Sequence, residues 1–189
     1  MATGSVKPES DFDVIIGARA GRIFTARFFC VIAFGFFGWR RAKLNHKESA
    51  TDKICLNHFV TEKSYQLSGS RNAYWEELYS NLVPLYGDSE KINKFFEANN
   101  GWLKRPKFYS DDLRHLYKKS SWTRKVREWI LGGAFGDLVE KILRRIQIAK
   151  IERSLKKDPP GYNPRIIYGD DELEFHPDTR RIELLGKTL

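Results

Sequence analysis

Two aspartates separated by one residue, Asp11 and Asp13, are the side chains whose types and spacing most directly indicate chemistry. They stand at the start of an apolar run, Val14 to Ile16, that predicts a buried strand. Residues i and i+2 of a strand point to the same face, so both carboxylates are expected to converge. Paired carboxylates suit Mg²⁺ or Mn²⁺, whose remaining ligands are usually water and substrate phosphates. The spacing fits a metal site for phosphoryl or nucleotidyl transfer, although it also occurs in polar turns that enter a strand.

The neighbouring residues favour the metal site. Gly4-Ser5 stands upstream, and Ser10 leads directly into Asp11-Phe12-Asp13 and the aliphatic strand. This stretch resembles the nucleotidyltransferase superfamily related to DNA polymerase beta, and the chain to about residue 108 loosely resembles its small bacterial members. The resemblance implies a two-metal mechanism with Asp11 and Asp13 as catalytic metal ligands and a nucleoside triphosphate as substrate. It leaves the acceptor open among small molecules, proteins and RNA.

The chain departs from the family pattern in the spacing of its first motif. The interval from Val6 to Ser10, between Gly4-Ser5 and Asp11, is shorter than in small members of the family. In one alignment Gly4, Ser5 and Ser10 contribute to nucleotide binding. In the other, which we favour, the family's Gly-Ser lies upstream of Met1 and the chain begins inside the domain.

A second departure concerns the third carboxylate that the family commonly supplies from a later strand. The sequence predicts that strand over residues 53–60, where the candidates are Asp52 at its entrance and Asn57 in its middle. An amide can coordinate a metal weakly, but it cannot act as a general base. Either Asp52 completes the site, or the site is impaired. An impaired site defines an alternative function, a non-catalytic relic that serves as a binding or interaction module.

Composition and charge favour a single folded domain with phosphate-bearing partners. The 189 residues are 41% hydrophobic and 14% aromatic, which is enough to fill one core. The 33 Lys and Arg against 24 Asp and Glu give a formal charge of +9, which attracts phosphates but does not separate a nucleotide from RNA.

Cysteine and histidine usage indicates neither a disulfide framework nor a zinc site. Cys30 and Cys55 each lie inside an apolar run without paired spacing, which favours a cytoplasmic protein. The histidines lack the spacing of a metal cluster and are interpreted as structural or surface residues. These are His46, His58, His115 and His176.

An apolar segment, Phe28 to Trp39, raises the question of a membrane. As a helix it covers about 18 Å, against a hydrocarbon core of about 30 Å, so it is too short to span a bilayer comfortably. We predict a helix from about residue 21 to 39 that is buried against the sheet. Because the segment is aromatic and flanked by arginines, a peripheral membrane protein is a second alternative.

The predicted fold class is α+β, with a small mixed sheet of nucleotidyltransferase type followed by a mostly helical remainder. We divide the chain into a partial nucleotidyltransferase-like core over residues 1–67, a helical region over 68–157 packed on it, and a C-terminal tail over 158–189. A strand-like run, Ile166 to Tyr168, lies in this tail.

Hydrophobic periodicity predicts the elements of the helical region. One helix is expected over residues 73–85, a second from Asp88 to Asn99, and a third over residues 137–157. The third helix is expected to bury one apolar side and expose a basic one. That apolar side comprises Leu138, Ile142, Leu143, Ile146 and Ile151. The glycines from Gly132 to Gly136 are interpreted as a hinge, and Asp170, Asp171 and Glu172 as an acidic turn in solvent.

Overall fold

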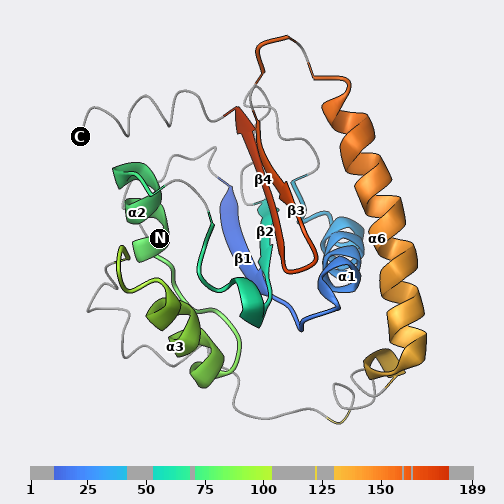
Figure 1. The fold of residues 1–189 in the computed structure, drawn as a ribbon, viewed down its shortest axis with the longest axis horizontal. Helices are drawn as coiled ribbons and strands as arrows, with labels where there is room; N and C mark the ends of the chain where they lie inside the picture. The colour runs from blue at the N-terminus through green and yellow to red at the C-terminus, as the bar shows by residue number, and fades with distance from the viewer. Residues whose placement is uncertain are drawn as a thin grey trace.

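The computed structural model describes residues 11–41, 53–68, 71–103, 122, 130–158, 160–162 and 164–178. These residues form a four-stranded mixed sheet with helices against both of its faces (Figure 1). The strands are β1 (Phe12–Gly17), β2 (Ile54–Val60), β3 (Pro164–Tyr168) and β4 (Glu172–Asp178). The helices are α1 (Ile23–Phe36), the short 3₁₀ helix η1 (Glu62–Ser64), α2 (Ala73–Ser80), α3 (Ser89–Ala98) and α6 (Ala134–Leu155). The expected combination of a mixed sheet with helices is confirmed.

The sheet joins the two ends of the described chain. Its strand order is β1-β2-β4-β3, with β1 parallel to β2 and the remaining neighbours antiparallel. Helix α1 is the crossover that a parallel β1–β2 pair requires. Residues 164–178, which the sequence placed in a C-terminal tail, supply β3 and β4 to the same sheet as β1 and β2.

Each face of the sheet carries its own hydrophobic cluster, because side chains alternate along a strand. On one face Leu56 and Phe59 of β2 pack with Leu173 of β4 against α1 and α6. On the other face Val60 packs with Trp75 of α2 and Phe95 of α3. Phe95 is the buried residue of α3, which lies within the range predicted for the second helix.

The pairing of β1 with β2 contains an irregularity that decides where polar side chains fall. Asp13 pairs with Cys55, whereas Ile15 pairs with His58, so β2 has one more residue in this interval than β1. Such a bulge breaks the simple alternation of faces. As a result the adjacent residues Asn57 and His58 contact Asp13 and Tyr79 respectively, although a regular strand would point them to opposite faces.

A buried carboxylate from α6 binds the N-terminus of α1. Glu140 accepts hydrogen bonds from the backbone N–H groups of Phe24 at 2.9 Å and Thr25 at 2.8 Å. The first N–H groups of a helix have no partner within the helix, and the helix dipole favours an anion there. Two turns further along α6, Gln147 donates to the Phe24 carbonyl at 2.8 Å and accepts from Arg27 at 2.7 Å.

The buried side of α6 only partly coincides with the side that its apolar residues predict. Gly136, Glu140, Leu143, Gln147 and Ile151 are buried. The remaining members of the predicted apolar side lie on the outer surface, namely Leu138, Ile142 and Ile146. The prediction is correct at Leu143 and Ile151 and wrong at these three residues, because Glu140 and Gln147 lie on the buried side, where they bind α1.

Helix α1 is also less buried than expected. Only its first turn, Ile23 to Thr25, is buried, and the helix ends at Phe36. Further along the helix Phe29, Ile32 and Phe36 are exposed. The prediction of a helix buried along its length over residues 21–39 is therefore corrected, since α1 packs on the sheet mainly through one end and one side.

Three further predictions are corrected by the structure. Helix α2 ends at Ser80, before the expected limit at Leu85. Gly136, assigned to a hinge before the helix, lies inside α6, which begins at Ala134. Glu172 is buried rather than in solvent, and it contacts His58 at 3.1 Å.

None of the helices in the described part of the chain combines the length and apolar character that a bilayer crossing needs.

We expect Glu140→Gln to lower the free energy of unfolding by about 1–3 kcal/mol, because one amide oxygen replaces two carboxylate oxygens that accept from backbone N–H groups. Urea denaturation followed by circular dichroism measures the loss. Glu152→Gln, an exposed change on the same helix, is the matched control and should leave stability almost unchanged. Equal effects of the two substitutions would contradict the role given to Glu140.

We expect Gly136→Ala to lower stability by about 1–3 kcal/mol, because its Cβ has no room beside backbone atoms. Gly133 provides the comparison, since a Cβ there meets nothing within 4 Å and the residue caps α6. Gly133→Ser should be neutral or slightly stabilising, because serine is a good N-cap residue. Thermal denaturation of both variants checks the contrast, and an unchanged melting temperature for Gly136→Ala would disprove it.

Candidate functional site

Strand β1, at one edge of the sheet, positions the paired aspartates. Asp11 immediately precedes the strand and Asp13 is its second residue. The Phe12 N–H donates to the Lys53 carbonyl at 2.8 Å, which aligns this end of β1 with the beginning of β2. The apolar residues Val14 and Ile16 anchor the strand in the cluster beneath α1 and α6. The two carboxylates are therefore held by a packed strand rather than by a loop.

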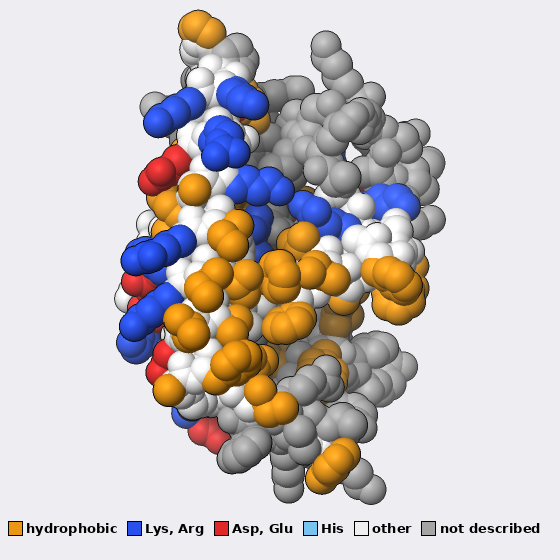
Figure 2. All heavy atoms as spheres, turned by 90° about the vertical axis from the view of Figure 1, so that its right-hand side faces the viewer, with side chains coloured by type: hydrophobic (Ala, Val, Ile, Leu, Met, Phe, Trp, Pro, Cys, Tyr) orange, Lys and Arg blue, Asp and Glu red, His pale blue; other side chains and the backbone are white. Residues whose placement is uncertain are grey.

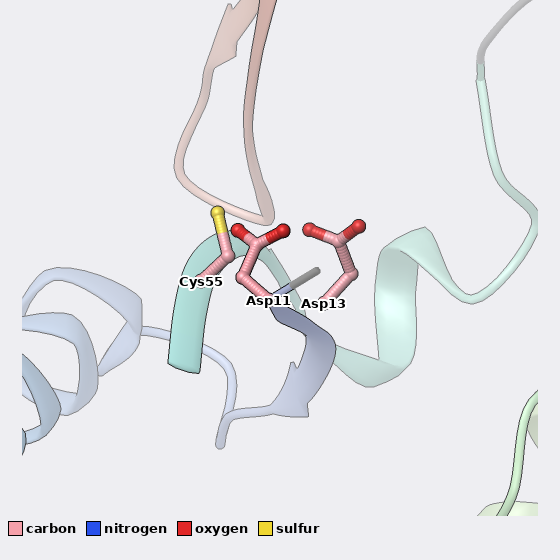
Figure 3. A group of neighbouring side chains, drawn as sticks. All are labelled: Asp11, Asp13 and Cys55. Carbon is pink, nitrogen blue, oxygen red and sulfur yellow. The ribbon is translucent and has the colours of Figure 1, made fainter. Parts of the chain in front are cut away.

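The two carboxylates converge with a thiol from the neighbouring strand. Ligand atoms of Asp11, Asp13 and Cys55 all lie within 4.8 Å of one another. Figure 3 shows the three side chains pointing to the same side, with the carboxylates turned toward each other. Two anionic oxygen donors at this separation match the needs of a hard divalent cation such as Mg²⁺ or Mn²⁺.

The charge on Asp13 is not fully compensated by its surroundings. The residue has solvent access, yet the surrounding protein dehydrates its carboxylate, which raises the pKa of Asp13, and the adjacent Asp11 carboxylate raises it further. His176 and side-chain hydrogen bonds from Cys55 and Asn57 act in the opposite direction without reversing the shift. A bound cation would remove the repulsion that this arrangement contains.

Arg41 compensates the negative charge of the other carboxylate, Asp11. Its guanidinium donates to Asp11 Oδ2 at 2.6 Å, and both side chains are largely shielded from solvent. Burial alone would lower the pKa of Arg41, but the hydrogen bond to Asp11 and the nearby negative charges raise it. Arg41 therefore fixes one carboxylate and places a cationic group beside the pair, where it can also meet a phosphate.

Asn57 is the residue that the structure brings to the pair as a further oxygen donor. Its side-chain Nδ2 donates to Asp13 Oδ1 at 2.7 Å, and the residue is buried. Rotation of the amide would present its oxygen instead. The alternative candidate Asp52 lies outside the described residues, as do Gly4, Ser5 and Ser10. Within the described residues no third carboxylate joins Asp11 and Asp13.

Cys55 is a neighbour that the sequence analysis missed. Burial, followed by the charges of Asp13 and Asp11, strongly raises the pKa of its thiol. A protonated thiol is a weak hydrogen-bond donor, whereas the two carboxylates beside it are the ligands that suit a hard divalent cation. Cys55 lies opposite Asp13 in the parallel register of β1 and β2. No sequence pattern indicated this proximity, because it depends on how the two strands pair.

A second polar cluster lies under α2 on the same face of the sheet. Glu174 is fully buried and binds Arg165 at 3.0 Å and Tyr79 at 3.2 Å, while His176 lies 3.0 Å from it. Burial would raise the pKa of Glu174, but His176, His58 and Arg165 together lower it. Unlike Asp13, this carboxylate is compensated by cationic partners, so the cluster is a structural network. The alternation of Glu172, Glu174 and His176 with apolar residues in β4 was the available signal.

The chain was compared with protein families, curated proteins and solved structures. No protein-family model, no curated protein and no solved structure matches the chain.

We expect Asp13→Asn to stabilise the fold at neutral pH by up to about 1 kcal/mol, a figure that allows for screening by solvent. The raised pKa means that the charged form is disfavoured in the folded state, so the penalty is present above that pKa and disappears as pH falls into the ordinary carboxyl range. The gain of the variant over wild type should therefore shrink on acidification. Thermal denaturation at several pH values measures it, and a variant less stable than wild type at neutral pH would refute the prediction.

Proposed function

We propose that this chain is a metal-dependent nucleotidyltransferase, which transfers a nucleotidyl group from a nucleoside triphosphate to a hydroxyl of an acceptor. The observation that carries the proposal is the convergence of Asp11 and Asp13 at the edge of a mixed sheet, with the Asn57 amide 2.7 Å from Asp13. The same residues carry the resemblance to the polymerase beta superfamily. Fold alone does not decide function, so the proposal rests on this donor set.

The donor set fits Mg²⁺ or Mn²⁺, held by Asp11 and Asp13 with Asn57 as a weaker ligand. The metal, when bound, would polarise the triphosphate and acidify the attacking hydroxyl. The acceptor oxygen forms a bond to the α-phosphorus while the bond from that phosphorus to the β-phosphate oxygen breaks. Pyrophosphate leaves, and the hydroxyl proton passes to solvent. Arg41 beside Asp11 supplies positive charge for the phosphate groups.

The basic character of the chain supports phosphate-bearing ligands but leaves the acceptor open. A formal charge of +9 raises the local concentration of anions such as nucleotides. The acceptor hydroxyl belongs to a small molecule, a protein or RNA, since the same catalytic groups serve each of these. The base of the nucleotide is equally open, because no described side chain is assigned to it. Placement in the cytoplasm stays a prediction.

A non-catalytic binding module is the second candidate, and one observation favours it. Within the described residues no third carboxylate joins Asp11 and Asp13, and the amide of Asn57 contacts Asp13 instead. An amide carries no negative charge and cannot act as a general base that takes the proton of the attacking hydroxyl. Such a module would bind metal and nucleotide without releasing pyrophosphate, so binding and turnover have to be measured separately.

We expect ATP or GTP to bind the folded chain only with Mg²⁺ or Mn²⁺, and the double variant Asp11→Asn/Asp13→Asn to weaken this binding by at least about tenfold, because both charged metal ligands are lost. Isothermal titration calorimetry with and without the metal measures the affinity. Release of pyrophosphate from ATP, measured with nucleoside, protein and RNA acceptors, then tests turnover.

The matched control is Asp170→Asn, which removes an exposed carboxylate paired with Arg144 away from the proposed site. It should bind metal and nucleotide as the wild type does. Binding without pyrophosphate release would support the binding module. A folded wild type that binds neither metal nor nucleotide would overturn both candidates.

A further inference from the structure

Helix α6 carries large apolar side chains on its exposed side as well as in the core. Phe135, Leu138, Ile142 and Ile146 follow one another at intervals of three and four residues, so they form a single stripe along the helix. Each of the four is about half exposed or more, between 49% and 60%. A free helix surface is normally polar, and a stripe of large apolar side chains on it is the usual sign of a binding surface.

The stripe continues onto α1, which packs beside α6. Phe29 and Ile32 are exposed on α1, Phe36 at its end is 85% exposed, and Trp39 follows in the next turn. Figure 2 shows these hydrophobic side chains gathered on one face of the molecule, over the two helices. We name this area of α1 and α6 the apolar surface.

Basic side chains adjoin the apolar surface. On α6 the exposed Arg145 lies beside the stripe. Further exposed basic residues follow toward the end of the helix, namely Lys150, Arg153 and Lys157. Figure 2 shows Lys and Arg side chains beside and above the hydrophobic area. Aromatic and aliphatic groups that enter the interface, bordered by cations that meet phosphates, are the features of a helix that lies on an anionic bilayer.

Charge also distinguishes a bilayer from a second copy of this chain. A two-fold dimer joins the same surface of both subunits, so it adds a second set of the same basic residues and no opposite charge. An anionic lipid surface supplies the opposite charge. No described helix can cross a bilayer, so contact would be at the interface only.

We propose that the apolar surface of α1 and α6 docks on the surface of a bilayer that contains anionic phospholipid. The aromatic and aliphatic side chains enter the boundary of the acyl chains, while the basic residues of α6 contact lipid phosphates. The proposal is independent of nucleotidyl transfer, because α1 and α6 cover one face of the sheet whereas the charge of Asp13 acts on Tyr74 of α2 at the other. Docking would leave the paired aspartates in water.

Flotation of the full chain with phosphatidylcholine vesicles, with and without phosphatidylserine, tests the proposal. We expect flotation with the anionic vesicles and weaker flotation at high salt. Phe36→Ser/Ile146→Ser should lower the vesicle affinity at least about tenfold, because two large apolar groups no longer enter the interface. Both positions are exposed, and circular dichroism of each variant verifies the fold.

The matched control is Leu85→Ser/Tyr86→Ser, which removes two large exposed side chains from the connection between α2 and α3. It should float as the wild type does. Arg153→Gln/Lys157→Gln should weaken flotation only with the anionic vesicles. The proposal is overturned if the wild type stays unbound, or if the apolar-surface variant floats as well as the control. Self-association without flotation, measured by analytical ultracentrifugation, would also overturn it and assign the surface to a second copy.

Discussion

The hydrogen bonds between the Glu140 carboxylate and the first N–H groups of α1 are the interaction on which the rest of the arrangement depends. Helix α1 is the crossover between β1 and β2, so its position sets these two strands side by side and parallel. That adjacency brings Cys55 and Asn57 of β2 to Asp13 of β1. A buried anion on one face of the sheet thus supports the geometry of a pair of anions on the other. The cost of burying Glu140 is offset because both of its oxygens accept hydrogen bonds at a helix N-terminus.

The polar face of the sheet contains carboxylates in two different electrostatic situations. Glu174 is deeper, yet its pKa is lowered because Arg165 and two histidines surround it. Asp13 has solvent access, yet its pKa is raised by dehydration and by Asp11. A fold gains stability from the first situation and loses it from the second. Carboxylates whose charge destabilises the fold are typical of functional sites. A divalent cation is the simplest partner that would remove this destabilisation at Asp13.

Local patterns of the sequence predicted the strand with its paired aspartates, the second strand and the existence of α3 and α6. These features depend on residues close in sequence, such as the alternation around Asp13 and the cap at Asp88. The buried side of α6 was predicted at Leu143 and Ile151 but not at Glu140 and Gln147, which are favourable inside only where the end of α1 meets them. The approach of Cys55 to the aspartates depends on strand register, and the burial of Glu172 on its partners His58 and Ser68. Each is a tertiary effect that periodicity does not contain.

The orientation of α6 links the interior of the protein to its surface. Glu140 and Gln147 lie with Leu143 and Ile151 on the buried side, and a second apolar stripe lies on the exposed side. Because Glu140 and Gln147 lie on the buried side, the apolar stripe is left on the surface. Its exposure to water is unfavourable unless another apolar surface covers it. The two faces of the sheet then differ in what they need. The proposed docking would place the side of α1 and α6 against an apolar boundary with anionic charge, whereas the proposed nucleotidyl transfer would need water, metal and nucleotide at the side of Asp11 and Asp13. An orientation with α1 and α6 against a bilayer satisfies both requirements at once.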